Sequence, residues 1–205
     1  MFKFIQRLLL GSLGASLIHI GVAFMTRALL GSDPLTLIEE ALVINFGLTL
    51  GTWNTIIGVV FALIAFICDK KKIGYTTIFY IASSHLIIDG MMSIITPASS
   101  ILIGVLYMIA SILAISLGSA FCVSARVGLS FYDAFIYSIT DRFHINYVIF
   151  RYSVEAILVL CSVILHHYPS FGTVFFLLAI GPSISTILKI IKGPIRRYLG
   201  MQEDY

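Results

Sequence analysis

Long apolar runs fill this chain and are separated by short polar stretches. The long runs cover residues 4–29, 51–68, 74–95, 99–125, 146–166 and 171–191, and a shorter segment follows the first run (34–46) and the fourth (130–142). About 20 apolar residues in a helix cross a hydrocarbon core of roughly 30 Å, whereas a helix of 13 residues is only about 20 Å long. The pattern predicts an all-α, polytopic membrane protein with six transmembrane helices plus two short helices.

The order of these runs repeats along the chain. The stretch GVAFMTRALLG, which begins at Gly21, returns as GSAFCVSARVG from Gly118, and one shift of 97 residues aligns both the glycines and the polar interruptions. We interpret this as an internal duplication, with repeat 1 at 1–97, repeat 2 at 98–192 and a tail at 193–205. Other aligned pairs are Ile18 with Ile115, Phe24 with Phe121, Gly31 with Gly128, Phe46 with Phe143 and Thr76 with Thr173.

Charged residues select the topology of the two repeats. If the short segments do not cross the membrane, each repeat has three spans and the halves are inverted. The basic clusters then all fall on the cytoplasmic side, as the positive-inside rule requires, whereas four spans per repeat would send the triple lysine outside. We therefore expect a 3+3 inverted repeat with both termini cytoplasmic. The clusters are Lys3 with Arg7, Lys70 to Lys72, Arg126 with Arg142, and Lys189, Lys192, Arg196 and Arg197.

Composition supports a single membrane domain over 1–205. Hydrophobic residues make up 59% and charged residues 11% of the chain, with a mean hydropathy of +1.03, whereas soluble domains carry roughly 25% charged residues. Cys68, Cys122 and Cys161 are isolated in apolar runs, so they are interpreted as small core residues rather than as ligands. No metal and no cofactor are expected.

The two short segments have two interpretations. Ser32 and Asp33 are good capping residues ahead of Pro34, so 34–46 begins as a helix, and 130–142 keeps an amphipathic pattern that includes Asp133. Each segment could lie at the membrane interface, or it could be a re-entrant helix whose N-terminus points into a protein cavity.

Charged and polar side chains inside the spans are the candidate functional residues, because a charge at the centre of a span costs roughly 2.5 to 3.5 kcal/mol. Arg151 and Glu155 lie one turn apart in the fifth span, either as an ion pair that locks helices together or as a substrate or ion site. Their duplicated positions are Asn54 and Gly58, so such a site would be asymmetric.

His85 and Asp89 form a second one-turn pair, in the third span. They are interpreted either as a buried hydrogen-bonded pair or as a site whose carboxylate couples to proton movement. Histidine is the side chain that titrates near neutral pH. Metal binding needs more ligands than this pair supplies.

Enzyme and nucleic-acid functions are not expected. Glu39-Glu40 resembles the start of the EExxxR helix of CAAX-processing-type intramembrane proteases, but Ile44 occupies the arginine position. Neither G-x-S-x-G nor H-E-x-x-H occurs. The basic residues flank spans rather than forming a nucleic-acid-binding patch, and their expected role is to set orientation and contact anionic lipid.

Several short motifs together resemble a known family. They are Gly31 to Pro34, Gly47 to Asn54, Gly128 with Asp133, Arg151 with Glu155, Gly172-Thr173 and Gly181-Pro182. In this order they resemble the bacterial YczE/YyaS/YitT-type membrane proteins, closest to the YczE-like branch, over residues 4–190. The resemblance implies a bacterial inner-membrane protein with a transport or membrane-accessory role, and it matches Arg151, Glu155 and Asp133 to polar positions of the family.

The resulting hypothesis is a small secondary-transporter-like carrier of an unidentified solute, with a non-transporting membrane accessory or scaffold subunit as the alternative. The expected partners are the lipid bilayer and a small-molecule or ion substrate, and a homo-oligomer or a complex with a membrane partner is compatible with the sequence. The candidate substrate or ion site consists of Arg151, Glu155, Asp133, Asn54, Asp89 and His85.

Overall fold

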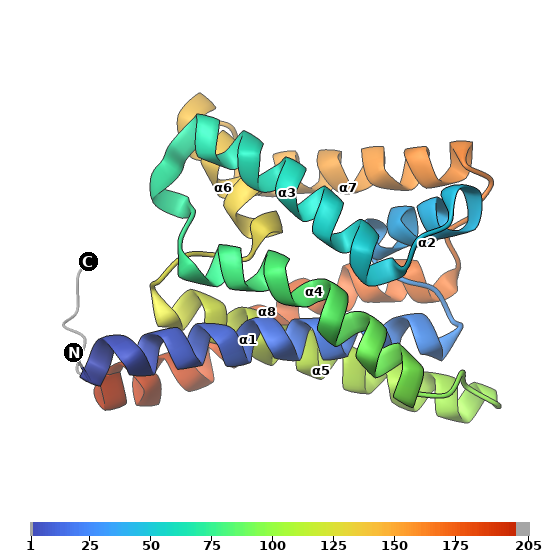
Figure 1. The fold of residues 1–205 in the computed structure, drawn as a ribbon, viewed down its shortest axis with the longest axis horizontal. Helices are drawn as coiled ribbons and strands as arrows, with labels where there is room; N and C mark the ends of the chain where they lie inside the picture. The colour runs from blue at the N-terminus through green and yellow to red at the C-terminus, as the bar shows by residue number, and fades with distance from the viewer. Residues whose placement is uncertain (1, 200–205) are drawn as a thin grey trace.

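The structure, a computed structural model, describes the backbone of residues 2–199 and the side chains of residues 3–191. Every regular element in this part of the chain is helical (Figure 1). The helices are α1 (Phe2–Ala28), α2 (Pro34–Phe46), α3 (Leu50–Asp69), the 3₁₀ turn η1 (Lys70–Lys72), α4 (Tyr75–Ile94), α5 (Ile101–Ala125), α6 (Phe131–Phe143), α7 (Tyr147–Ile164) and α8 (Phe171–Leu199).

Six of these helices, α1, α3, α4, α5, α7 and α8, are long and apolar enough to cross a membrane. The other two, α2 and α6, have 13 residues each. Large apolar side chains such as Leu63, Leu86 and Leu102 are exposed on the outer faces of the long helices. The predicted all-α fold of six spanning and two short helices is therefore confirmed. The predicted sixth span ends at 191, but α8 continues to Leu199; residues 200–205 of the predicted tail lie outside the described residues.

The same succession of elements occurs twice, in opposite directions. The first and last residues of α6 lie 97 positions after those of α2. Helix α5 likewise ends at Ala125, 97 positions after the end of α1 at Ala28. Left-handed backbone recurs with the same shift, at Leu29 and Arg126, Gly31 and Gly128, and Gly47 and His144. In Figure 1 each helix runs opposite to its counterpart, with α2 at one end of the bundle and α6 at the other. The fold is an inverted repeat.

The most extensive contact between the two halves is the crossing of α1 and α5. A Cβ added to Gly118 would lie 2.5 Å from the carbonyl oxygen of Gly14, and one added to Gly14 would lie 2.7 Å from the carbonyl oxygen of Gly118. The inverted counterpart of this contact joins Gly21 to Ser111, whose carbonyl oxygen lies 3.1 Å from an added Cβ. Glycine is needed here because the two backbones touch.

The loops before the short helices pack on the starts of α4 and α8. The carbonyl of Val127 accepts a hydrogen bond from the amide of Thr76 (3.1 Å), and the carbonyl of Leu30 accepts one from the amide of Gly172 (2.9 Å). Gly31 and Gly128 then adopt φ angles of +117° and +110°, which residues with a side chain rarely tolerate. This explains why the duplicated stretches GVAFMTRALLG and GSAFCVSARVG both end on a glycine.

The helices form two layers (Figure 1). One layer holds α1, α4, α5 and α8, in which α4 packs on α1 and α8 packs on α5. The other holds α2, α3, α6 and α7, in which α7 packs on α2 and α6 packs on α3. The contacts between the two layers are not symmetric. Helix α3 packs extensively on α4, whereas their counterparts α7 and α8 barely contact each other over the described residues.

We predict that Gly118→Ala destabilises the protein by about 1 to 3 kcal/mol, because its methyl group overpacks the α1–α5 crossing. The thermal unfolding midpoint of the detergent-solubilised protein measures this loss. Gly90→Ala is the matched control, since nothing lies within 4 Å of its added Cβ and alanine favours helix over glycine. Equal midpoints for the two variants would contradict the close crossing.

Candidate functional site

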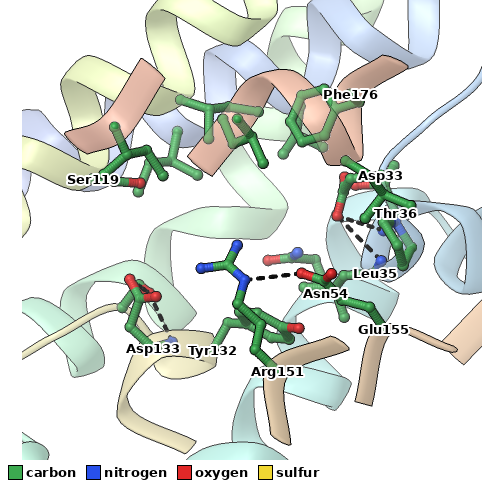
Figure 2. A pocket seen from close by; sticks show the side chains of 18 of the residues that line it. Asp33, Leu35, Thr36, Asn54, Ser119, Tyr132, Asp133, Arg151, Glu155 and Phe176 are labelled. Carbon is green, nitrogen blue, oxygen red and sulfur yellow. Dashed lines mark hydrogen bonds and ion pairs between the residues drawn. The ribbon is translucent and has the colours of Figure 1, made fainter. Parts of the chain in front are cut away.

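A cavity of about 100 Å³ lies between the two layers (Figure 2). Its walls come from both repeats at positions related by the 97-residue shift, so it lies at the interface between the halves. A space of about 10 to 15 Å³ on this measure already holds one water, so this central cavity has room for several waters or one small solute. The symmetry-related wall pairs are Ile18 and Ile115, Val22 and Ser119, Asp33 and Ser130, Leu35 and Tyr132, Thr36 and Asp133, Asn54 and Arg151, and Tyr80 and Leu177.

Both short helices turn their N-termini toward the central cavity. Asp33 caps α2 by accepting hydrogen bonds from the amides of Leu35 (3.1 Å) and Thr36 (3.4 Å). Ser130 caps α6 by accepting one from the amide of Asp133 (3.2 Å). The first residues of both helices line the cavity. Of the two interpretations of the short segments, this arrangement fits the re-entrant one.

Arg151 carries the positive charge of the cavity. Its Nε donates to Oε1 of Glu155 (3.0 Å) and its Nη1 donates to the Tyr147 hydroxyl (3.0 Å), and its guanidinium lies 5.8 Å from the centre of the Tyr132 ring. Figure 2 shows the guanidinium projecting into the cavity between Asp133 and Asp33. The predicted pair with Glu155 therefore exists, but both partners belong to α7, so the ion pair does not itself tie α7 to another helix.

Three carboxyl groups line the central cavity together with this one guanidinium. They belong to Asp33, Asp133 and Glu155. Ser130 donates a hydrogen bond from its hydroxyl to Oδ2 of Asp133 (2.8 Å). Burial raises the pKa of Asp33 to about 6, against the opposing effect of the hydrogen bonds from Thr36 and Leu35. The lining therefore contains three carboxyl groups and one guanidinium.

Behind the cavity wall, Glu39 is fully buried on α2. Its Oε1 accepts a hydrogen bond from Nδ2 of Asn54 (2.9 Å), while its Oε2 has no hydrogen-bond partner among the described residues. Burial raises the pKa of Glu39 well above its usual value, and the nearby Asp33 carboxyl raises it further. Burial of Glu39 therefore favours the protonated form of its carboxyl group.

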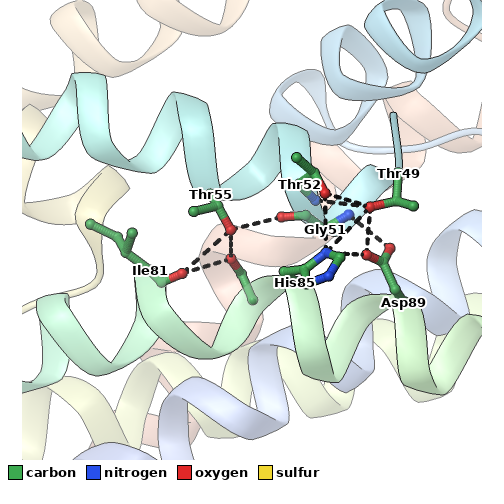
Figure 3. Close-up of polar contacts among 8 residues, drawn as sticks. Thr49, Gly51, Thr52, Thr55, Ile81, His85 and Asp89 are labelled. Atoms are coloured by element: carbon green, nitrogen blue, oxygen red, sulfur yellow. Dashed lines mark hydrogen bonds and ion pairs between the residues drawn. The ribbon is translucent and has the colours of Figure 1, made fainter. Parts of the chain in front are cut away.

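The structure separates His85 and Asp89 from the central cavity (Figure 3). Oδ1 of Asp89 accepts from the amide of Gly51 (3.0 Å), and Oδ2 accepts from the Thr49 hydroxyl (2.6 Å). His85 Nδ1 lies 2.7 Å from Oδ2 of Asp89. The two side chains lie within hydrogen-bond distance and join α4 to the start of α3, but the pair is not buried as one of its interpretations held, because the His85 side chain is 54% exposed.

Asp89 instead lines a larger cavity of about 670 Å³ at the α2 end of the bundle, which we call the end cavity. Glu40 on its wall lies 3.1 Å from Nε2 of His167, and this hydrogen bond raises the pKa of His167. Ser32 donates a hydrogen bond to the other oxygen of Glu40 (2.6 Å). Residues 31 and 32 line the end cavity while residues 33–36 line the central one, so the first turn of α2 lies between the two cavities.

Of the six candidate residues, the structure thus brings together Arg151, Glu155, Asp133 and Asn54 and places His85 and Asp89 elsewhere. Sequence reasoning treated Asp33 only as a helix cap and Glu39 only as part of a protease-like motif. Their roles in the wall depend on which face of α2 packs inward. The duplication in the sequence could have identified this part of the wall. Thr36 aligns with the candidate residue Asp133, which marks the first turn of α2 as part of the same wall.

Among known proteins, a model of a family of unknown function (DUF6198) matches residues 5–189. No curated protein and no solved structure matches the chain. The resemblance to the YczE-like branch stays a prediction.

We predict that Glu39→Gln flattens the dependence of stability on pH. Because the folded state holds the Glu39 proton more tightly than the unfolded state does, stability is highest below the unfolded pKa of 4.5 and falls as pH rises toward the raised folded pKa. The slope from one such group is at most about 1.4 kcal/mol per pH unit. Thermal midpoints of the parent protein and the variant, compared at pH values from about 5 upward, measure this slope.

The control for this experiment is Asp141→Asn, which removes an exposed carboxylate from the ion pair with Lys72 at the α6 end. It should keep the parent slope above pH 7. Identical slopes in the parent protein and Glu39→Gln would mean that Glu39 is ionised in the folded state.

Proposed function

We propose that this chain, which belongs to that family of unknown function, is a small secondary-transporter-like carrier and that the central cavity is its substrate site. One observation carries the proposal. A charged cavity lies at the interface of two inverted repeats, and the N-termini of two short helices form part of its wall. Secondary transporters place substrate sites in this position, because inverted repeats can exchange conformations around a fixed central site.

The unequal packing of the two halves also supports a carrier. Alternating access needs two states in which the repeats swap conformations, so each single state has to be asymmetric. Here α3 packs on α4 whereas α7 and α8 barely contact each other. In addition, the first turn of α2 lies between the central cavity and the end cavity. We propose that movement of this turn connects the two cavities.

We further propose that the protein lies in the bacterial inner membrane, with the α6 end in the cytoplasm. Lys70 to Lys72 and Arg142 lie at this end, where Arg142 donates to the carbonyls of Ile67 and Cys68. In Figure 1 the start of α1 lies at the same end. Basic residues next to spans favour the cytoplasmic side, so the end cavity would open toward the periplasm.

Cysteine labelling tests this orientation. In a background with Cys68, Cys122 and Cys161 changed to Ala, we expect Lys71→Cys to react with a membrane-impermeant maleimide only after the membrane is opened. Ser99→Cys, in the loop at the opposite end, should react in intact cells after removal of the outer membrane. Labelling of position 71, but not 99, from outside would reverse the proposed orientation.

Solute-induced currents of the purified protein on a solid-supported membrane test the carrier itself. We expect at least one member of a panel of small cations, anions and neutral solutes to give a saturable current that empty liposomes lack. The double variant Arg151→Met with Glu155→Leu should fold and lose this current, because both charges leave the cavity together. Arg151→Met alone is expected to cost about 3 to 5 kcal/mol of stability, since it strands the buried Glu155 carboxylate.

The matched control is Lys72→Gln with Asp141→Asn, which removes a second ion pair (2.6 Å) outside both cavities and should keep the current. If the folded protein gives no current with any solute, the accessory-subunit hypothesis replaces the carrier. A double variant that folds and keeps full current would exclude the Arg151 and Glu155 pair from the transport cycle.

A further inference from the structure

We propose that the central cavity binds a small organic cation that carries N–H groups, of the alkylammonium or guanidinium class. This inference rests on the proposed function, since it names the class of substrate for the same site. Three features of the lining support it: its unbalanced charge, a buried acceptor without a donor, and the division of its walls into an acidic and an apolar side.

The charges of the lining are not balanced. Glu155 is paired with Arg151 (3.0 Å), but Asp33 and Asp133 form no ion pair among the described residues. The hydrogen bonds that these carboxylates accept come from neutral groups. Asp33 accepts from the amides that follow it in α2, and Asp133 accepts from the Ser130 hydroxyl. A carboxylate withdrawn from water without a cationic partner is costly. A bound cation would remove this cost at both carboxylates.

A separate observation comes from Asn54, which is 2% exposed and lines the cavity. Its Nδ2 donates to Glu39, which leaves Oδ1 as the remaining polar atom of the amide. This Oδ1 has no hydrogen-bond partner among the described residues. Buried polar atoms are nearly always satisfied, and a ligand in the cavity can supply the missing donor. An N–H group on a cation fits this acceptor, whereas a simple carboxylate or halide ion has no donor to offer.

The helix N-termini and Arg151 would by themselves suit an anion. However, Asp33 and Ser130 already occupy the first amides of α2 and α6, and Glu155 occupies the Nε of Arg151. The features that usually attract an anion are therefore partly satisfied from within the protein.

The two walls also differ in polarity. Asp33, Asp133, Asn54 and the Arg151–Glu155 pair come from the layer of α2, α3, α6 and α7, while the facing layer presents apolar side chains, with Ser119 among them (Figure 2). The rings of Tyr80 and Tyr132 also line the cavity, where they can contact a cation face-on. A ligand with a charged N–H end and a short apolar body fits these walls. The apolar side chains are Ile18, Val22, Ile115, Phe176, Leu177 and Ile180.

Binding is tested with three probes of similar size, using the thermal unfolding midpoint of the purified full-length protein in detergent at constant ionic strength. Propylammonium is expected to raise the midpoint in a saturable way. Tetramethylammonium, which has the charge without N–H groups, should act only at higher concentration, and propionate should have no saturable effect. Methylammonium and guanidinium at low concentration extend the panel.

Asp133→Asn is expected to weaken the apparent affinity for propylammonium about tenfold or more, because it removes a partly buried partner charge from the cavity. Asp141→Asn, on the same helix and 54% exposed in its side chain, is the matched control and should leave the affinity unchanged. If Asp133→Asn does not fold, Asn54→Leu serves as the second variant, since it removes the unpartnered acceptor.

Three results would overturn the inference: no saturable shift with any N–H cation, a shift with propionate or a divalent metal ion in their place, or equal affinities in both Asn variants. The outcomes of this experiment and of the current measurement are distinguishable. Cation binding without current would keep the inference and reject the carrier, whereas currents with an anionic or neutral solute and no cation binding would do the opposite.

Discussion

The close crossing of α1 and α5 is the contact on which the rest of the structure depends. Gly14 and Gly118 let the two backbones touch, and in a membrane this kind of close packing replaces the hydrophobic effect as the force between helices. The same two helices carry α4 and α8 on their flanks. They also supply symmetry-related side chains, Ile18 and Ile115, to the apolar wall of the central cavity. The crossing therefore places both the repeats and the cavity between them.

A second constraint follows from the breaks before α2 and α6. Irregular backbone at membrane depth is tolerated only where its polar groups are satisfied by protein or line a cavity. Here Asp33 and Ser130 cap the new helices, and the carbonyls of Leu30 and Val127 accept hydrogen bonds from the starts of α8 and α4. Gly31 and Gly128 make the required turns. These breaks bring polar helix ends, which a continuous span would not have, to the centre of the molecule.

The duplication supplies the geometry of the cavity, and divergence between the halves supplies its chemistry. Asn54 in one half corresponds to Arg151 in the other, and Thr36 corresponds to Asp133. Gly58 corresponds to Glu155; a Cβ added to Gly58 would lie 3.0 Å from the ring of Phe131, so a glutamate would have to displace the start of α6. Packing thus restricts which of two symmetry-related positions can carry a charge. As a result, repeat 2 supplies more charged side chains to the cavity than repeat 1 does.

The sequence by itself determined the helices, their number and the inverted repeat. The bilayer imposes both a length and an apolar composition on every span, and the 97-residue shift was visible in glycines that packing requires. The one-turn spacing of Arg151 and Glu155 likewise settled their contact, because i and i+4 share a helix face. Only the tertiary structure decided which polar residues meet across helices. His85 and Asp89 have the same spacing as Arg151 and Glu155, yet they contact the start of α3, while Glu39 is buried against Asn54 and the adjacent Glu40 faces the end cavity. The rotation of each helix about its own axis makes this difference, and it is set by contacts between residues far apart in the chain, which a local pattern does not contain.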